Sequence, residues 1–552
     1  MKLTFKISLF FCLYFGIISF FMGNYIESYD IMYASIAMGE YFDFLNNDYY
    51  SSSTQLFILQ ILSSFVEILP VKINIFGYFL LFFHFISLWF FVLITFKYLE
   101  NYNRKIKFLI VIVVLSLIAD NIINLNSTRL AALGCVNLFL ISKSGFFDTK
   151  KTYVLLTILG YSLFISLIRF EIVLLLSAIL YLIMIVNNPK FSLSLSIPLI
   201  VSASVFLFYN TYGVYKAPLS SQIFYFFEHH SKFNQESLPP NYYQLKDAGI
   251  ENIKDDSIKK ESLKYSSLFL FGIPDTLTIN QKYIDDVTGT VPDNLLYLIG
   301  RVNLQTFIDT LNFSLESFIL CLHLILFSIF LTVLIFLNTK IHKVLFSMLF
   351  YIVLPVFVNL HIDTPIRFLY PYYSFFIIFV MINYADSVFD NKYFYTIGIS
   401  CFLFFNTFHQ FSTIKKYRVE QNSYIAFNNT FNSLNPENNL AVVEFAPQLS
   451  MISRSPLSNP SSSNIIFLSD FLIYNTNNKT WKNICNCDSE SLLSKLSFVA
   501  NNKVLFIYNN ERLDFLKLHL RYNYNLSLEI CDKIKRINDD LYISKICLKP
   551  IN

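Results

Sequence analysis

Residues 74–96 read NIFGYFLLFFHFISLWFFVLITF and contain no Asp, Glu, Lys or Arg. A helix needs roughly 20 mostly apolar residues to cross the hydrocarbon core of a bilayer, and this run has that length. Within lipid, only a helix or a closed barrel satisfies all of its backbone hydrogen bonds. The stretch therefore predicts a transmembrane helix in an integral membrane protein.

Comparable apolar runs elsewhere predict about eleven spanning helices in all. They lie at 5–23, 74–96, 107–123, 128–142, 152–168, 171–187, 191–209, 314–337, 343–360, 366–384 and 392–409. The run 128–142 is short, and a re-entrant helix is the alternative there. Residues 54–69 are apolar on one face only, which is typical of a helix that lies at the membrane interface.

The composition of the whole chain agrees with this interpretation. Of 552 residues, 55% are hydrophobic and 14% are charged, and the mean hydropathy is +0.50. Soluble domains are roughly a quarter charged, so a string of soluble domains is excluded. The net charge of +4 is too small to indicate a nucleic-acid partner. No Gly-rich phosphate-binding loop occurs, which argues against a nucleotide site of that kind.

Lysine and arginine in the short connections predict the orientation, because cytoplasmic loops carry an excess of both. If the spans alternate, all the basic connections fall on one side. They hold Lys2, Lys6, Lys97, Arg104, Lys105, Lys107, Lys143, Lys150, Lys151, Lys190, Lys340, Lys343 and Lys392. The other side receives the outer loops 24–73 and 210–313. We therefore predict a transmembrane domain at 1–412 whose sizeable polar segments all lie outside the cytoplasm.

The tail from 413 to 552 has a different pattern. Strand-like runs alternate with helix-like ones such as SESLLSKLSFVA at 489–500, and the strand-like runs are 440–445, 464–469, 503–508 and 541–548. This alternation predicts a small extracytoplasmic α/β domain.

Four cysteines lie in this tail: Cys485, Cys487, Cys531 and Cys547. In an oxidising compartment they can pair, and we consider a bond from one of the first two to one of the last two. A zinc site is the weaker alternative, because no nearby histidine supports the C-x-C pair.

Ionisable residues gather at the predicted outer ends of the helices, where each is a functional candidate by default. They are Asp30, Arg129, Arg169, Glu171, His361, Asp363 and Arg367. Guanidinium groups bind phosphate in bidentate fashion, and a carboxylate can accept the proton of a hydroxyl as general base. Helix-end anchoring and internal ion pairs are the structural alternative. The pattern favours a transferase that acts on a lipid-phosphate-linked group.

The chemical class of the molecule that supplies the transferred group can be inferred by elimination. A nucleotide-sugar enzyme needs a soluble domain for the nucleotide, and the cytoplasmic connections are too short to form one. We therefore expect the donor to be a sugar linked to a polyprenyl phosphate, which is available outside the cytoplasm.

With these features the chain resembles the GT-C superfamily of integral-membrane glycosyltransferases, which includes protein O-mannosyltransferases and the aminoarabinose transferases of lipid A. Asp30 in SYDIMYASIAMGEYF at 28–42 resembles the catalytic acidic residue that follows the first span in that family. RFLYPYYSF at 367–375 is similar to an Arg–aromatic–x–x–Pro stretch that opens a late span. Ile31 departs from the second acidic residue of many relatives, and SSST at 51–54 departs from their Pro-rich entry to the interfacial helix.

The resemblance implies sugar transfer from a polyprenyl-phosphate-linked donor to a glycan, lipid or protein acceptor, at the outer face of a bacterial inner membrane. It implies Asp30 as general base, the donor phosphate on Arg129, Arg169 and Arg367, and supporting roles for Glu171, His361, Asp363 and Tyr370. No metal site is predicted, although a divalent ion is used by some relatives, and Glu228, His229 and His230 are the set that could hold one.

Two other classes of protein compete with this interpretation. An O-antigen-type polysaccharide polymerase also has about a dozen spans and uses arginines in outer loops, but it seldom carries a folded C-terminal domain of this size. A transporter of lipid-linked glycans is less favoured, because transporters usually show internal repeats and substrate sites at mid-membrane.

Overall fold

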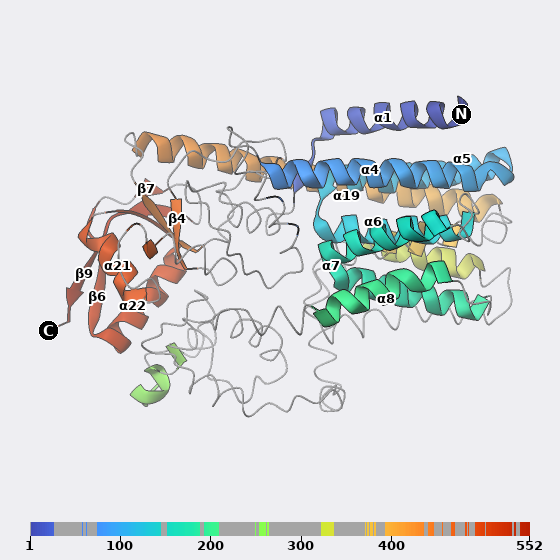
Figure 1. The fold of residues 1–552 in the computed structure, drawn as a ribbon. Coiled ribbons are helices and arrows are strands. Elements are labelled where there is room, and N and C mark those ends of the chain that lie inside the picture. The colour runs from blue at the N-terminus through green and yellow to red at the C-terminus, as the bar shows by residue number, and fades with distance from the viewer. Residues whose placement is uncertain are drawn as a thin grey trace. The chain divides into compact units, whose positions relative to one another are not determined.

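The computed structural model divides the chain into two compact units. Unit 1 comprises Met1–Glu27, Gly77–Asn210 and Val302–Arg418, and unit 2 comprises Ser28–Phe76, Thr211–Arg301 and Val419–Asn552. Besides isolated residues, the structure describes residues 2–26, 74–144, 152–187, 193–208, 253–260, 322–335, 392–434, 440–445, 465–469, 492–502, 504–532 and 541–551. Figure 1 shows the elements within these ranges.

The membrane-type helices follow the predicted apolar runs. They are α1 (Lys2–Met22), α4 (Ile75–Tyr98), α5 (Arg104–Ile123), α6 (Ser127–Ser144), α7 (Thr152–Asn187), α8 (Leu193–Phe208) and α19 (Lys392–Leu434), with a 3-10 turn η1 (Leu99–Asn101) after α4. Among the described residues, four helices are long and apolar enough to cross a membrane: Thr4–Met22, Ile75–Tyr98, Arg104–Ile123 and Thr152–Phe170. This is compatible with an integral membrane protein.

Three shorter apolar helices, Ser127–Ile141, Ser196–Phe208 and Leu322–Ile335, overlap the further predicted spans 128–142, 191–209 and 314–337. The run 343–360, most of 366–384 and most of the interfacial segment 54–69 lie outside the described residues. The total of eleven spans therefore stays a prediction.

Contacts between the first helices of unit 1 define their directions. Tyr14 in α1 donates to the carbonyl of Leu115 in α5 at 2.8 Å, and Asn24 donates to the carbonyl of Ile122 at 2.8 Å, so α1 and α5 run the same way. The Trp89 indole in α4 donates to Ser8 Oγ at 3.0 Å, and Phe85 makes an edge-to-face contact with Phe15, so α4 runs the opposite way.

The basic ends of these three helices consequently lie together, as alternating spans require. Lys6 is near the start of α1, Lys97 is in the last turn of α4 and Arg104 begins α5. The opposite end of the group holds the last turns of α1 and α5 and the start of α6.

A short parallel pair of strands joins the ends of α1 and α5. Gly23, with φ at +84°, ends α1 in the left-handed conformation that favours glycine. The chain then forms β1 (Tyr25–Ile26), which pairs with β2 (Asn124–Leu125) between α5 and α6. Tyr25 also stacks on Tyr417 of α19 at 4.9 Å between ring centroids. These contacts hold α1, α5 and α19 together at this end.

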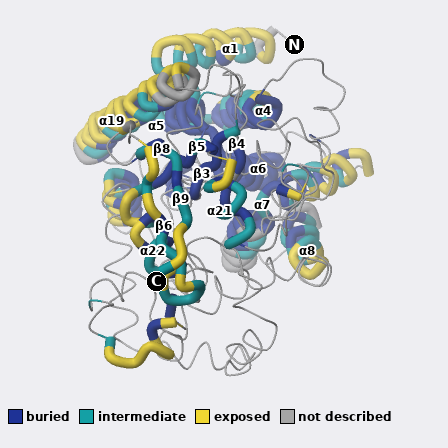
Figure 2. Tube along the Cα trace, turned by 90° about the vertical axis from the view of Figure 1, so that its left-hand side faces the viewer, coloured by how far each residue is buried: buried dark blue, intermediate teal, exposed yellow. Residues whose placement is uncertain are grey.

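Helix α6 is the buried centre of unit 1. Every residue from 127 to 141 is buried, whereas α1 and α19 are extensively exposed, as the colours of Figure 2 show. A helix that is surrounded on all sides packs closely where its residues are small. A Cβ atom at Gly134 would lie 2.5 Å from Ile165 Cγ2 in α7, so the Ile165 side chain packs directly against this glycine.

We expect Gly134→Ala to destabilise unit 1 by about 1–3 kcal/mol, because the added methyl overpacks the contact with Ile165. Gly160→Ala in α7 is the matched control, since a Cβ there meets nothing within 4 Å. Alanine favours a helix over glycine by roughly 1 kcal/mol, so the control should be neutral or stabilising. Thermal unfolding of both variants in detergent compares them. Equal midpoints for the two would contradict this account of the contact.

Helix α19 is longer than its predicted span. The span was expected to end at 409, but the helix continues to Leu434 and has 43 residues. At 1.5 Å per residue it is about 65 Å long, roughly twice the hydrocarbon thickness of a bilayer. The sequence from 410 to 434 loses hydropathy but has no Gly or Pro to stop a helix. The domain boundary predicted at 412–413 falls inside this helix.

Unit 2 contains the α/β region predicted in the tail. Its main sheet has the order β4-β3-β5-β8-β7, formed by β3 (Ala441–Phe445), β4 (Ile465–Ser469), β5 (Leu505–Tyr508), β7 (Lys535–Arg536) and β8 (Tyr542–Ser544). β3 is parallel to β4 and to β5, whereas β8 is antiparallel to β5 and β7. Helix α21 (Leu492–Asn501) precedes β5, and α22 (Asn510–Tyr524) follows it.

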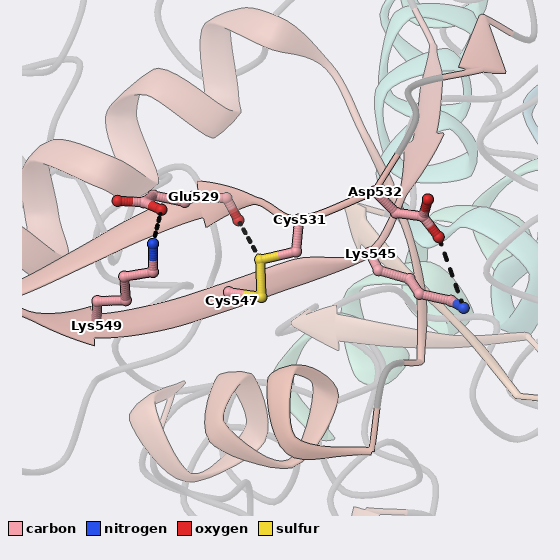
Figure 3. The surroundings of a disulfide bond; sticks show 6 residues. All are labelled: Glu529, Cys531, Asp532, Lys545, Cys547 and Lys549. Atoms are coloured by element: carbon pink, nitrogen blue, oxygen red, sulfur yellow. Dashed lines mark hydrogen bonds and ion pairs between the residues drawn. A yellow bond between two sulfur atoms is a disulfide. The ribbon is translucent and has the colours of Figure 1, made fainter.

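A second sheet pairs β6 (Leu526–Ile530) with β9 (Ile546–Pro550) in antiparallel register. The predicted run 541–548 is therefore two strands in two sheets, separated at Lys545. This pairing brings Cys531 and Cys547 together in a disulfide with a Cα–Cα distance of 5.8 Å (Figure 3). The bond differs from the pairings considered from the sequence. Cys485 and Cys487 lie outside the described residues.

Part of the outer loop 210–313 packs within unit 2. In the segment 253–260, Asp255 caps a helical turn by accepting a hydrogen bond from the Ser257 backbone N–H at 2.8 Å. Lys259 from this turn lies over the ring of Tyr522 in α22, 5.6 Å from its centroid. The rest of the loop, including Glu228, His229 and His230, lies outside the described residues.

Candidate functional site

A buried ion pair lies where α5 meets α6. Asp120 is in the last turn of α5, Arg129 is in the first turn of α6, and the Arg129 Nη1 group donates to Asp120 Oδ2. The two side chains are 0% and 5% exposed. A buried charge is costly unless a charge of opposite sign lies beside it. Asp120 and Arg129 each compensate the buried charge of the other.

The connection between the helices holds both charged residues in place. Asn124 donates from Nδ2 to the other carboxylate oxygen of Asp120 at 3.0 Å. Asn126 accepts a hydrogen bond from the Arg129 backbone N–H at 2.6 Å, as an N-cap residue does at the start of a helix. The sequence DNIINLNSTR at 120–129 thus forms a helix end, a short strand and a capped helix start.

Tyr370 connects this ion pair to a second group of polar residues. The Arg129 guanidinium carbon lies 4.2 Å from the centroid of the Tyr370 ring, which is a cation–π contact. The Tyr370 hydroxyl donates to Asn406 Oδ1 in α19 at 3.3 Å. Tyr370 and Asn406 are both buried.

Asn406 uses both ends of its amide. Oδ1 also accepts from His323 Nε2 at 3.1 Å, and Nδ2 donates to Ser116 Oγ in α5 at 2.7 Å. One turn further along α19, Gln410 donates to the Ser116 carbonyl at 2.9 Å. Asn406 therefore joins α5, α19 and the helix Leu322–Ile335 around Tyr370. The rings of His323 and His409 lie 4.9 Å apart beside it.

We refer to Asp120, Arg129, Tyr370, Asn406, Ser116 and His323 as the polar cluster. It offers one carboxylate, one guanidinium and several neutral hydrogen-bonding groups in a buried setting. Such an arrangement fits the binding of an anion by Arg129, with Asp120 fixing the orientation of the guanidinium. In the part of the chain that the structure describes, no three His, Cys, Asp or Glu side chains gather into a metal-binding group.

The predicted site residues fall into three groups. Arg129 and Tyr370 are brought into contact, although 241 positions of sequence (370 minus 129) separate them. Arg169 and Glu171 lie in α7, and the Glu171 side chain is not described. Asp30, His361, Asp363 and Arg367 lie outside the described residues, so their predicted roles stay predictions.

Arg169 marks the break between two predicted spans. Its backbone, at φ −156° and ψ 84°, is not helical, and α7 is two helices that meet there, between the predicted spans 152–168 and 171–187. Ser87 binds Asn137 of α6 and Tyr161 of α7, and Gly134 approaches Ile165. From Asn137 to Gly134 the contacts move toward the start of α6, whereas from Tyr161 to Ile165 they move along α7 toward Arg169. The two helices are therefore antiparallel here. Arg169 is thus at the same end of unit 1 as Arg129.

Asp120 was not among the residues predicted for the site. The signal was present, because Asp120 is the only acidic residue in the apolar run 107–123. An ionisable residue within a span is costly and is a functional candidate for that reason. Asp120 also lies near the predicted outer end of that run, where the predicted site residues gather, so residue type and position together indicate it.

A second unusual carboxyl group is in unit 2. Glu444 of β3 is 0% exposed, and its Oε2 accepts a hydrogen bond from the Asn509 backbone N–H at 3.3 Å. Burial raises the pKa of Glu444 to about 8, against the opposing charge of Arg512 and the hydrogen bond from Asn509. The carboxyl group is therefore largely protonated at neutral pH.

This shift predicts that unit 2 loses stability as the pH rises. Between the ordinary pKa of 4.5 and about 8, the folded protein keeps a proton that the unfolded chain releases. The stabilisation is fully present below the lower pKa and is lost as the pH rises through the upper pKa. It amounts to on the order of 5 kcal/mol at most. Glu444→Gln should remove this pH dependence.

The two tryptophans make the measurement specific to unit 2. With Trp89→Phe, the buried Trp481 of unit 2 is the only tryptophan of the chain. Its fluorescence should report a thermal midpoint that falls from about pH 5 to about pH 9 with Glu444 and stays level with Gln. Asp514→Asn, at an exposed carboxylate of α22, should keep the original slope. If the thermal midpoint fell equally with pH in the Glu444→Gln variant and in the protein with Glu444, then Glu444 would not be the source of the pH dependence.

No family model matches the sequence, and no curated protein or solved structure matches it either.

Proposed function

We propose that the chain is a membrane glycosyltransferase of the GT-C kind, with about eleven spans, that moves a sugar from a polyprenyl-phosphate donor to an extracytoplasmic glycan, lipid or protein acceptor. The observation that carries the proposal is the contact between Arg129 and Tyr370. The two residues come from separate regions of the sequence, and the sequence predicts a site role for each. Arg169, at the same end of unit 1, supports the same location.

The chemistry requires an acceptor hydroxyl, a base and a stabilised leaving group. Asp30 accepts the proton of the hydroxyl, whose oxygen then attacks the anomeric carbon of the donor sugar. The bond from that carbon to the phosphate oxygen breaks, and the polyprenyl phosphate leaves with the electron pair. Arg129, Arg169 and Arg367 stabilise the charge that develops on the phosphate.

Asp120 refines the role of Arg129 in this scheme. A guanidinium group has five N–H donors in a planar fork, so it can bind a carboxylate on one side and a phosphate on another. The carboxylate of Asp120 fixes the plane of the fork and lowers the cost of keeping the cation buried. The Tyr370 ring beneath it restrains the same group from one face.

The proposed location is the bacterial inner membrane, with the site and the tail on the extracytoplasmic side. The bond between Cys531 and Cys547 supports this placement of the tail, because disulfides persist in oxidising compartments. The direction of α1, α4 and α5 supports it as well, because the ends with Lys6, Lys97 and Arg104 lie together, opposite the polar cluster.

Mass spectrometry of surface glycans and lipids, with and without the gene, tests the proposal. We expect one sugar to be missing from one class of product when the gene is deleted, and to return with a plasmid copy. Shorter chains of an otherwise complete glycan would indicate the polymerase instead. Transport of a lipid-linked glycan into liposomes without any new product would indicate the transporter.

A further inference from the structure

One face of α19 changes from apolar to basic within a single turn. Residues that recur at spacings of four and three positions lie along the same face of a helix. Lys416 is exposed beside this face, and Figure 2 shows the exposed side of α19 in yellow. A series with these spacings has only exposed members, namely Phe404, Phe408, Phe411, Lys415 and Arg418.

Contacts with α1 place the basic turn at the end of a membrane-length helix. The apolar span in α1 ends at Met22. Met22 packs against a buried cluster that contains Tyr25 and Tyr417. Arg418 Nη2 also donates to the carbonyl of Phe21 at 3.4 Å. The basic turn of α19 therefore lies level with the end of the α1 span.

The apolar stretch of α19 also has the length of a bilayer. Between Lys392 and Lys415 the helix contains no Asp, Glu, Lys or Arg. At 1.5 Å per residue these two lysines are about 35 Å apart along the helix, close to the thickness of the hydrocarbon core. Both observations put Lys415, Lys416 and Arg418 at the depth of the lipid headgroups.

The three cations at this level lack an acidic partner of their own. Among the described residues, no Asp or Glu side chain forms an ion pair with any of them. Arg418 uses one N–H for the Phe21 carbonyl and keeps its other donors. At headgroup depth the available anion is a lipid phosphate, which lysine binds as a point charge and arginine as a fork.

We propose that Lys415, Lys416 and Arg418 form a binding site for one anionic phospholipid. Its phosphate lies on the three cations, and an acyl chain lies along Phe411 and Phe408. A lipid with a net negative charge is favoured over phosphatidylcholine, because the choline ammonium is repelled by the same cations.

This site is separate from the polar cluster. Asn406 and Gln410 are on the buried side of α19, where they bind Ser116 of α5. A lipid on the exposed side does not reach them, so the expected occupant is a membrane phospholipid rather than a sugar donor. The inference needs α1 and α19 to cross the membrane, but it does not rest on the proposed transferase function.

The experiment uses the full-length protein in detergent, titrated with phosphatidylglycerol or with phosphatidylcholine that has the same acyl chains. Native mass spectrometry counts the lipids bound to each protein molecule. Each basic residue near an anionic lipid contributes roughly fivefold to binding. We therefore expect the first phosphatidylglycerol to bind about 10²-fold more tightly than phosphatidylcholine.

A triple variant with Gln at 415, 416 and 418 should lose this preference. The matched control is Lys517→Gln/Lys545→Gln/Lys549→Gln, which removes the same number of positive charges from unit 2. Each of these three lysines is paired with an acidic residue, so the control should keep the preference.

Two further variants guard against a failure to fold and against a loss of packing alone. Lys415→Gln/Lys416→Gln leaves the contact from Arg418 to Phe21 intact, and it should weaken phosphatidylglycerol by at least about tenfold. Lys415→Arg/Lys416→Arg keeps both charges and should bind the lipid as the unsubstituted protein does.

Several outcomes would overturn the proposal. They include equal binding of the two phospholipids by the unsubstituted protein, and an equal loss in the two triple variants. Tighter binding of a polyprenyl phosphate than of phosphatidylglycerol would assign the site to a donor lipid instead. Displacement of phosphatidylglycerol by an equimolar amount of inorganic phosphate would show a site for a soluble anion.

Discussion

Replacing Asp30 with Asn is expected to reduce sugar transfer by about 10²- to 10⁴-fold, the range that a general base contributes. Asparagine has nearly the same size and can still accept a hydrogen bond, but it cannot take up the proton of the acceptor hydroxyl. The loss should appear in turnover rather than in the amount of folded protein. Transfer from a polyprenyl-phosphate sugar, measured with purified protein in nanodiscs, gives the rate.

Asp48→Asn is the matched control, because Asp48 is an acidic residue of the same outer loop with no assigned role. It should transfer sugar at the rate of the unsubstituted protein. Both variants should give the same thermal midpoint. Full activity with Asn at position 30 would show that another group is the base, and the buried carboxylate of Asp120 would then be the next candidate.

The helices of unit 1 were largely predictable from sequence because lipid imposes a simple rule. A span must be an unbroken apolar run, and α4 accordingly begins and ends within about two residues of the predicted run 74–96. This rule applies only to the residues that lie within the lipid. Beyond residue 409 the length of α19 depends on helix propensity and on contacts such as Tyr417 with Tyr25, which hydropathy does not indicate.

The polar cluster was only half predictable for a related reason. Arg129 and Tyr370 could be selected by residue type and by the side of the membrane to which they were assigned. Asn406 could not, because its importance comes from Ser116 and His323, and 290 positions separate it from Ser116. An asparagine in an apolar run indicates a hydrogen bond but not its partner. In the tail, the pairing of β6 with β9 likewise determined which cysteines met.

The second large effect is expected from the Asp120–Arg129 ion pair. Asp120→Asn or Arg129→Met alone should destabilise the protein by about 3–5 kcal/mol, because each leaves the other charge buried without its partner. The double variant should lose much less than the two single losses added together, since it leaves no uncompensated charge. Chemical or thermal unfolding in detergent measures all four proteins.

An exposed pair in the same chain gives the control cycle. Lys517 and Asp514 of α22 lie 3.0 Å apart and are 42% and 63% exposed. Because solvent screens them, Lys517→Met and Asp514→Asn should couple by less than about 1 kcal/mol. Coupling of equal size in the two cycles would contradict the account of Asp120 and Arg129 as a buried pair.

The double variant also separates a structural role of Arg129 from a catalytic one. If the guanidinium only compensates Asp120, then removing both charges should restore stability and sugar transfer together. If Arg129 stabilises the departing phosphate, then stability should return while transfer stays low. We expect the second result, with a loss in turnover of about 10²-fold or more, as found when a donor to developing negative charge is removed. Tyr370→Phe keeps the ring beneath Arg129 and removes only the hydroxyl, so it should retain most of the activity.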